Sequence, residues 1–168
     1  MSEYIKKDYN DLIIIPSSFT NIRSRKEIFP YYKHNSGFHL PLITAPMDTV
    51  VDEYNDILFL NNKINVCYPR GIKIKNKINL FNGTMQFESI SLNDFEKLVI
   101  EKNLIANNKD GKYYVCIDIA NGHMSFLHEL IKSAKNKFGD KIVIMAGNIA
   151  NPETFKILSN NGADYIRI

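Results

Sequence analysis

Four polar side chains stand at or just beyond the ends of apolar, strand-like runs in this sequence: Asp118, Asn121, Asn148 and Arg167. A polar group in such a place is costly to bury without a partner, so it either bonds its neighbours or faces a ligand. In proteins built on a parallel sheet, ligand-handling residues lie where the strands end on their carboxyl side. The four residues are therefore candidates for a ligand site.

Each candidate also has a purely structural interpretation. Asp118 could cap the helix that follows it, and Asn121 with Gly122 could form a turn chosen for its backbone geometry. Asn148 could satisfy backbone groups of its own loop. Arg167 could lie on the surface of an edge strand if the sheet were open. The residue types alone leave these alternatives open.

Strand-like and helix-like runs alternate along most of the chain. We expect strands over residues 40–47, 64–69, 83–90, 112–120, 141–149 and 163–168. We expect helices over residues 48–62, 91–105, 125–138 and 151–162. This alternation indicates an α/β fold with a parallel sheet covered by helices. An open doubly wound sheet and a TIM (β/α)8 barrel fit equally well, although a full barrel typically needs about 250 residues.

Two of these helices are marked by the residues at their ends. Ser91 and Asp94 have the spacing of a capping box, in which a hydroxyl and a carboxylate satisfy the first backbone donors. Asn151 as N-cap, Pro152 in the first turn and Gly162 past the end mark the last helix.

The composition is that of an ordinary globular domain. The 168 residues are 45% hydrophobic and 23% charged, and the formal net charge of +3 comes from scattered lysines. A nucleic-acid-binding surface needs clustered positive charge, so we expect no nucleic-acid partner. No apolar run is long enough to span a membrane and no signal core is present, so we expect no membrane association and a cytoplasmic location.

The remaining reactive residues give little guidance. Cys67 and Cys116 lie in apolar strand-like runs, and we expect a buried, reduced pair without a disulfide or a metal site. His34 and His39 have no evident partner in the sequence. We find no Ser-His-Asp or Cys-His constellation and no glycine-rich phosphate loop.

Several motifs together resemble the IMP dehydrogenase/GMP reductase family. In order along the chain they are YNDLIIIP, SRKE, LPLITAPMDTV, DIANGH, MAGNI and GADYIRI. The resemblance covers nearly the whole chain and is weakest between residues 62 and 90. It implies a TIM barrel, present as about six strands in residues 41–168 after an N-terminal arm over residues 1–40. Only a short run separates the second expected strand from the third, so we expect no inserted CBS-type regulatory domain.

The resemblance implies an oxidoreductase that acts on a purine nucleotide, GMP or IMP, with a nicotinamide cofactor. GMP reductase converts GMP to IMP by reductive deamination with NADPH, and IMP dehydrogenase oxidises IMP to XMP with NAD. Residues 24–27 and the DIANG stretch are similar to the reductase branch, whereas Pro46 is similar to the dehydrogenases. We favour the reductase with NADPH, and the dehydrogenase with NAD is the alternative.

The match to the family's motifs also implies roles for individual residues. Ala45, Met47, Asn148 and Arg167 would contact the purine nucleotide. The residues that would contact the cofactor are Ser24, Arg25, Arg70, Asp118, Ile119, Ala120 and Asn121. Asp118 would hold the nicotinamide ribose, because a carboxylate can accept both ribose hydroxyls in charge-assisted hydrogen bonds. Ser24 and Arg25 resemble the arm that, in the reductases, reaches the dinucleotide of a neighbouring subunit, where an arginine suits the 2′-phosphate of NADPH.

The chain departs from the family's pattern in two places. The family's second strand ends in histidine followed by a basic residue, whereas this chain reads Tyr68-Pro69-Arg70 and keeps only the positive charge. The family's catalytic cysteine lies in a glycine-rich loop after the sixth strand, where a monovalent cation is also expected. That place lies beyond Ile168, so no residue of this chain is assigned as catalytic.

Two kinds of function follow from this departure. The chain could be the front part of an enzyme, completed by further sequence or by a complementing C-terminal fragment. It could instead be a non-catalytic partial barrel that only binds. The resemblance further implies a homo-oligomer, of which the tetramer is the family's usual form.

Overall fold

The computed structural model describes residues 9–34, 37–72, 83–101, 104–108 and 110–168.

Contacts divide the chain into two units, Met1–Pro30 and Tyr31–Ile168, and each is described by itself. The first unit contains two short 3₁₀ helices, η1 (Tyr9–Asp11) and η2 (Arg25–Glu27). The compact second unit begins at Tyr31, ten residues before the barrel start expected from the sequence.

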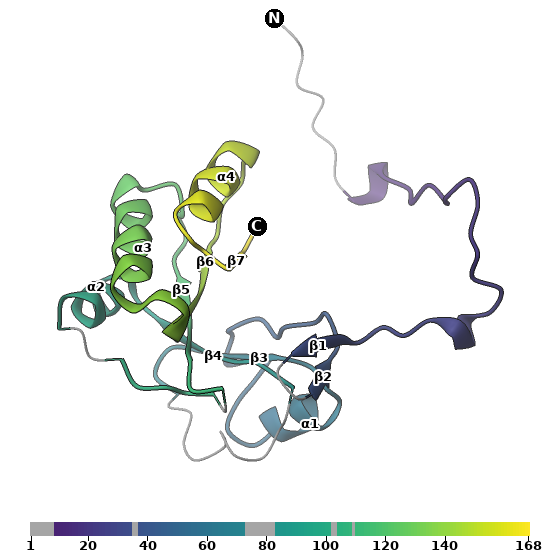
Figure 1. Ribbon diagram of the computed structural model, residues 1–168, viewed down its shortest axis with the longest axis horizontal. Coiled ribbons are helices and arrows are strands. Elements are labelled where there is room, and N and C mark those ends of the chain that lie inside the picture. Colours follow the sequence, from purple (N-terminus) through teal and green to yellow (C-terminus); the bar gives the residue numbers. More distant parts are fainter. Residues whose placement is uncertain (1–8, 35–36, 73–82, 102–103, 109) are drawn as a thin grey trace, which may run out of the picture. The chain divides into compact units, whose positions relative to one another are not determined.

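A five-stranded sheet forms the centre of the second unit. Its strands are β3 (Val66–Tyr68), β4 (Gln86–Ile90), β5 (Tyr113–Asp118), β6 (Ile142–Gly147) and β7 (Tyr165–Ile166). Neighbouring strands are parallel and follow the order of the chain, β3-β4-β5-β6-β7 (Figure 1). A doubly wound sheet reverses its strand order at a switch point, whereas this order never reverses. The sheet is therefore part of a barrel, which resolves the alternative that the sequence left open.

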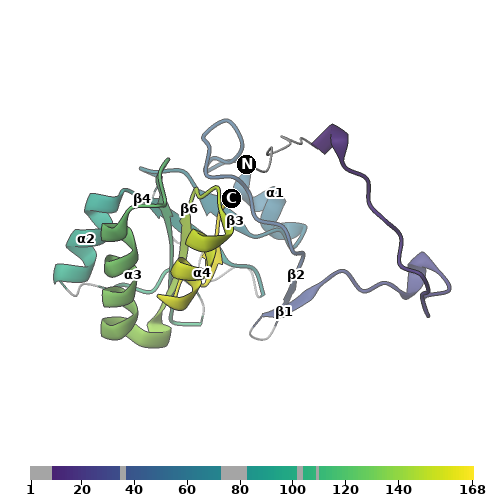
Figure 2. The same ribbon diagram turned by 90° about the horizontal axis from the view of Figure 1, so that it is seen from above.

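Three helices cover the outer face of β5 and β6. They are α2 (Leu92–Glu101), α3 (Ser125–Phe138) and α4 (Pro152–Asn160), and their buried side chains form one core with those of β5 and β6. Helices α2 and α3 lie side by side (Figure 2). The cap at Asn151 is confirmed, since its Oδ1 accepts from the Thr154 amide at 2.7 Å. The capping box is confirmed in its first half, since Ser91 Oγ accepts from the Asp94 amide at 3.1 Å, but the Asp94 carboxylate accepts from the Ser91 hydroxyl at 2.6 Å. None of the described helices is long and apolar enough to cross a lipid bilayer.

The two faces of β5 bury different side chains. Val115 and Ile117 point into the apolar core beneath the helices, while Tyr114 and Cys116 point to the inner face of the half-barrel. Successive side chains of a strand alternate between faces, so Asp118 continues the inner row and ends it at the carboxyl edge. The sequence places one carboxylate at the mouth of an otherwise apolar interior.

The strand expected over residues 40–47 is wrong. Only one parallel bridge forms, between Ile43 and Asn65, with backbone hydrogen bonds of 3.0 Å from Thr44 N to Asn65 O and from Asn65 N to Leu42 O. Two prolines, at positions 41 and 46, flank this bridge, and proline has no amide hydrogen to donate to a ladder. The Leu42–Thr44 segment therefore lies beside β3 without forming a full strand.

The helix expected over residues 48–62 is wrong in its first half. The helix α1 covers only Asp56–Asn61. Before it, Asp52 Oδ1 accepts from the amides of Tyr54 and Asn55, both at 2.8 Å, and Asn55 Oδ1 accepts from the amide of Asp52 at 2.9 Å. These local side-chain bonds satisfy backbone donors in a turn and compete with the helix.

The other expected elements are present with shorter ends. The strand expected over 163–168 covers only Tyr165–Ile166, and the helix expected over 91–105 ends at Glu101. Residues 102 and 103 of that expected helix lie outside the described residues. Helix α3 begins and ends where the sequence predicts.

A hairpin that the sequence did not predict precedes the sheet. It consists of β1 (Tyr32–His34) and β2 (Gly37–His39), paired antiparallel. His34 Nε2 lies 2.9 Å from the hydroxyl of Tyr114, which donates to Asp110 Oδ2 at 2.7 Å. His39 Nδ1 lies 2.9 Å from Asn65 Nδ2. The two histidines thus have partners, and they fix the hairpin to the sheet.

Candidate functional site

The inner carboxyl edge of the sheet brings together three of the residues that the sequence assigned to a site. Arg167 Nη1 donates to Asp118 Oδ1 at 2.5 Å, and Arg70 Nε lies 3.7 Å from Asp118 Oδ2. The three residues come from the loop after β3, the end of β5 and the segment after β7. We call Arg70, Asp118 and Arg167 the carboxylate cluster.

The structural alternatives for two members of the carboxylate cluster are excluded. Helix α3 begins at Ser125 with Met124 as its N-cap, so Asp118 does not cap it. The side chain of Arg167 is 26% exposed and turned toward Asp118, so it is not a surface residue of an edge strand. Both residues instead face the interior of the half-barrel.

The backbone next to β6 fixes the position of Arg167. Its amide donates to Ala146 O at 2.9 Å, and its carbonyl accepts from the Ile149 amide at 3.0 Å. Gly147 lies between these two contacts with a φ of +148°, and a Cβ on it would lie 2.4 Å from Arg167 O. Only glycine allows this close approach. The glycine of the MAGNI motif is therefore what lets Arg167 reach Asp118.

Arg167 also approaches the thiol of Cys116, with 3.8 Å between Nη1 and Sγ. Burial works against the charge of Arg167, but the hydrogen bond to Asp118 and the nearby Cys116 raise its pKa above the ordinary value. Arg167 is therefore always charged. A charged guanidinium satisfied on one side by a carboxylate is a rigid element of the site.

The two cysteines lie one layer deeper than the carboxylate cluster. Cys67 and Cys116 are free thiols that are fully buried on the inner face, as the sequence predicts. Cys67 Sγ is 3.4 Å from Ser89 Oγ. The contact with Cys67 and the charge of Arg167 lower the pKa of Cys116, while Cys116 and burial raise the pKa of Cys67. Neither thiol is exposed where a ligand could reach it, and the described residues contain no cluster of three potential metal ligands.

The loops after β5 and β6 pack against each other beside the carboxylate cluster. Ile119 O accepts from the Asn148 amide at 2.7 Å, and Asn148 O accepts from the Gly122 amide at 2.8 Å. Asn121 Oδ1 accepts from the amide of His123 at 3.1 Å, which is the turn that the structural interpretation expected. The side chains of Ala120, Asn121 and Asn148 are exposed at this edge.

His123 is a residue of this edge that the sequence analysis missed. Its Nε2 accepts from the Ala150 amide at 3.1 Å, so Nδ1 carries the hydrogen and donates to Thr154 Oγ1 at 2.7 Å. The imidazole thus ties the loop after β5 to the start of α4. Its position as the last residue of the DIANGH motif is the sequence feature that could have identified it.

The remaining assigned residues are not part of the carboxylate cluster's bonding. Ala45 and Met47 are exposed in the turn after the Leu42–Thr44 segment, where Met47 N donates to Ala45 O at 2.8 Å. Ser24 and Arg25 belong to the separate first unit. There Ser24 Oγ accepts from the Lys26 amide at 3.3 Å and caps η2, and Arg25 is exposed.

Tyr68 and Arg70, where the chain departs from the family's histidine, point in different directions. The hydroxyl of Tyr68 donates to Asp56 Oδ2 at 2.7 Å, and the ring packs against the core around α1 on the outer side of the sheet. Arg70 lies near Asp118. Arg70 therefore lies in the site, whereas Tyr68 belongs to the core on the outer side of the sheet.

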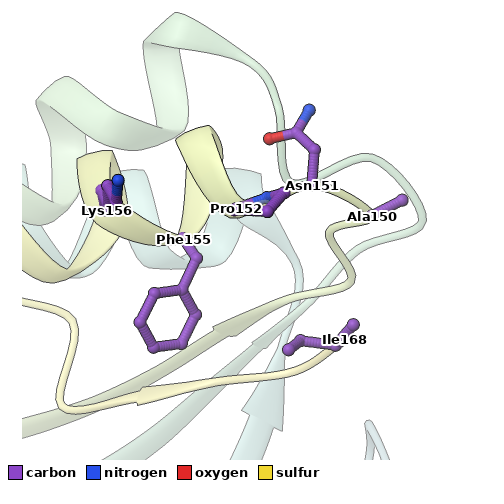
Figure 3. A pocket seen from close by; sticks show the side chains of 6 residues that line it. All are labelled: Ala150, Asn151, Pro152, Phe155, Lys156 and Ile168. Carbon is purple, nitrogen blue, oxygen red and sulfur yellow. The ribbon is translucent and has the colours of Figure 1, made fainter. Parts of the chain in front are cut away.

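A cavity of about 410 Å³ lies between the start of α4 and the end of the chain. Phe155 projects from α4 toward the strand segment that leads to Ile168, and the walls are mostly apolar (Figure 3). The cavity is lined by Ala150, Asn151, Pro152, Phe155, Lys156 and Ile168. Its chemistry suits apolar side chains of a polypeptide better than a charged nucleotide.

The carboxylate cluster has an oxygen that could accept a hydrogen bond from a ligand hydroxyl. The Asp118 carboxylate is 25% exposed, and its Oδ2 has Arg70 at 3.7 Å, which is beyond direct hydrogen-bond distance. That oxygen therefore keeps a direction open for a hydroxyl donor. Asp118 could hold a ribose, with the backbone of Ile119 and Ala120 beside it.

Comparisons with known proteins identify relatives of this chain. Residues 96–168 match the family model described as IMP dehydrogenase / GMP reductase domain. The chain is 31% identical over 170 residues to a GMP reductase from Lactobacillus delbrueckii subsp. bulgaricus, an alignment that covers 96% of this chain and 49% of that protein. It is 32% identical over 174 residues to a GMP reductase from Lactobacillus gasseri, with 100% and 52% covered.

A solved structure supports the fold. A crystal structure of inosine 5′-monophosphate dehydrogenase from Legionella pneumophila aligns with a TM-score of 0.64 at 24% identity, over 94% of this chain and 48% of that one. The chain spans about half the length of the curated relatives it matches.

Proposed function

We propose that this chain, which belongs to the IMP dehydrogenase/GMP reductase family, supplies the cofactor-binding half of a purine nucleotide oxidoreductase of the GMP reductase type. The reaction would be the NADPH-dependent reductive deamination of GMP to IMP. The observation that carries the proposal is the position of Asp118, a partly exposed carboxylate at the inner carboxyl edge of a half-barrel. In barrels of this kind the chemistry is done at that edge.

Each member of the site has a role in this proposal. Asp118 accepts the hydroxyls of the nicotinamide ribose, and Arg167 holds the carboxylate in place. Asn121 and Asn148 present exposed amides to the bound molecules at the same edge. The nicotinamide supplies the hydride, and the residues of this chain bind and orient it. Ala45 and Met47 would contact the purine nucleotide, and Ser24 and Arg25 would contact the dinucleotide of a neighbouring subunit.

The covalent nucleophile has to come from other sequence. Cys67 and Cys116 are fully buried beneath the carboxylate cluster, so neither can attack a purine bound at the edge. We propose that the catalytic cysteine belongs to a polypeptide segment that completes the barrel, either further along the same chain or in a complementing fragment. The assembled enzyme would be a homo-oligomer.

IMP dehydrogenase activity with NAD is the second candidate. Pro46 favours it, because the dehydrogenase pattern has proline before the methionine at this position. The residues of the carboxylate cluster would serve either reaction. A partial barrel that binds without catalysis is the third outcome.

The test is an assay with and without a source of the missing half. The chain is purified alone and mixed with the separately produced C-terminal half of the Lactobacillus gasseri GMP reductase. We expect no turnover by the chain alone and NADPH consumption with GMP by the mixture. NADH formation from IMP by the mixture would favour the dehydrogenase. Turnover by the chain alone would contradict the external nucleophile.

A further inference from the structure

Two guanidinium groups share one carboxylate in this site. Arg167 is hydrogen-bonded to Asp118 Oδ1, and Arg70 stands 3.7 Å from Oδ2 without a direct hydrogen bond. With both arginines charged and Asp118 ionised, the carboxylate cluster has one positive charge in excess. The excess is associated with Arg70, because Arg167 already has Asp118 as its partner.

Arg70 is the most exposed member of the carboxylate cluster. Its side chain is 57% exposed, against 26% for Arg167 and 25% for Asp118. A ribose hydroxyl that binds Asp118 Oδ2 can take the direction that Arg70 leaves open, while Arg70 keeps its charge beside the ligand. Removing Arg70 would therefore change the local charge without removing the hydrogen bond that holds Asp118.

Nicotinamide dinucleotides differ in charge between their two redox states. The nicotinamide ring carries a positive charge when oxidised and is neutral when reduced, and the two forms have the same phosphates. The ribose 2′-hydroxyl is one carbon away from the carbon that bears the nicotinamide nitrogen. A ribose held at Asp118 therefore brings the ring close to the excess positive charge.

We propose that Arg70 makes this site select the reduced dinucleotide over the oxidised one. The inference rests on the proposed function. It also favours one direction of the redox reaction, because a site that disfavours the cationic ring suits a reductase. Like charges repel, and the repulsion acts on NADP⁺ and is absent for NADPH. The position that keeps the positive charge at the end of the second expected strand thus becomes a determinant of redox-state preference.

The experiment compares the dissociation constants of NADPH and NADP⁺ for the purified chain. NADPH is titrated by its own fluorescence, and NADP⁺ is titrated by competition. The variants are Arg70→Gln, which removes the charge, and Arg70→Lys, which keeps it. Lys132→Gln is the matched control, because it removes one positive charge from an exposed position on α3.

We expect the unaltered chain to bind NADPH more tightly than NADP⁺. Arg70→Gln should reduce this preference by roughly three- to tenfold, as one partly screened charge several ångströms away would. Arg70→Lys should retain the preference, and Lys132→Gln should leave it unchanged. In the unaltered chain, added salt should reduce the ratio of the NADP⁺ and NADPH dissociation constants. This tests the electrostatic origin of the preference without any substitution.

The outcomes separate this inference from the proposed function. Binding of both dinucleotides with a preference that neither Arg70→Gln nor salt changes would overturn the role of Arg70 and leave the dinucleotide site intact. Binding of neither dinucleotide would contradict the proposed function, and the inference would fall with it.

Discussion

At the scale of single residues, the site depends on how Asp118 is held. Its two oxygens face different arginines at 2.5 and 3.7 Å, so one oxygen is satisfied within the protein and the other remains available. A carboxylate fixed in this way loses little freedom when a ligand binds. The pair with Arg167 is therefore the first contact to test.

A double-mutant cycle measures that contact. Asp118→Asn and Arg167→Gln are made singly and together, and each single change removes the charge-assisted hydrogen bond between Arg167 and Asp118. We expect a coupling free energy of about 1–3 kcal/mol. Urea unfolding followed by circular dichroism measures it, because the chain has no tryptophan to report by fluorescence. A coupling free energy near zero would mean that the pair does not hold Asp118.

Some of the site could be predicted from the sequence and some could not. Asp118 and Arg167 could be predicted as site residues, because polar residues that end apolar strands must find partners. The contact between Arg167 and Cys116 could not be predicted. The two residues are far apart in sequence, and they meet because Cys116 is on the inner face of β5. Asn121 carries an exposed amide, but its described bond is local, so residue type alone could not separate a ligand contact from a turn.

At the scale of elements, the approach of β7 to β6 depends on one glycine. Gly147→Ala would place a Cβ 2.4 Å from Arg167 O at a φ of +148°. We expect the free energy of unfolding to fall by about 2–5 kcal/mol, from overpacking added to backbone strain. Urea unfolding measures the loss.

A second glycine separates the steric effect from the backbone effect. Gly139 also has a positive φ, +55°, but nothing lies within 4 Å of a Cβ built there. Gly139→Ala should therefore cost only the backbone strain, about 1 kcal/mol. Equal losses for the two variants would contradict the steric role of Gly147.

The hairpin gives a prediction on pH. Burial lowers the pKa of His34 below its ordinary 6.5, opposed by Asp110 and assisted by the charges of His39 and Lys112. A folded-state pKa below the unfolded value means that folding favours neutral His34. The full contribution of His34 to the free energy of unfolding is therefore present above pH 6.5. It falls as the pH drops below 6.5, by at most about 1.4 kcal/mol per pH unit.

The measurement compares the chain with His34→Gln. Unfolding free energies are taken one pH unit above and one pH unit below 6.5, where most carboxylates remain ionised. The unaltered chain should lose more stability on acidification than the variant does. The same loss in both would show that His34 does not couple the hairpin to pH.

The elements themselves were predictable where one physical signal dominated. Helix α3 has amphipathic periodicity over its whole length, and its bounds agree. The expected helix over 48–62 failed because Asp52 and Asn55 hydrogen-bond the backbone in a turn. The hairpin was missed because its strands have three residues each, too few for alternation to be visible, although Asn35-Ser36-Gly37 is a turn-forming sequence.

At the scale of the whole molecule, the described sheet has two edges. The Leu42–Thr44 segment forms one through its bridge to β3, and β7 forms the other. Open edges and an apolar cavity beside β7 favour pairing with another polypeptide. We predict that the 168-residue chain studied alone self-associates reversibly as its concentration rises.

Sedimentation velocity tests this prediction with a matched pair of variants. Phe155→Lys places a charge in the cavity beside β7, and Ile100→Lys places one on an exposed position of α2 away from that edge. Phe155→Lys should reduce association, and Ile100→Lys should not. A chain that sediments as a monomer at every concentration would contradict the role of the open edges.

The central claim is that this half-barrel binds a nicotinamide dinucleotide through Asp118, and Asp118→Asn tests it most directly. The amide keeps the shape of the side chain and removes its charge. NADPH titration of both chains, with circular dichroism to verify that both are folded, should show binding weakened about ten- to a hundredfold, the loss expected for a charge-assisted hydrogen bond. Equal NADPH affinity in the two folded chains would contradict the account.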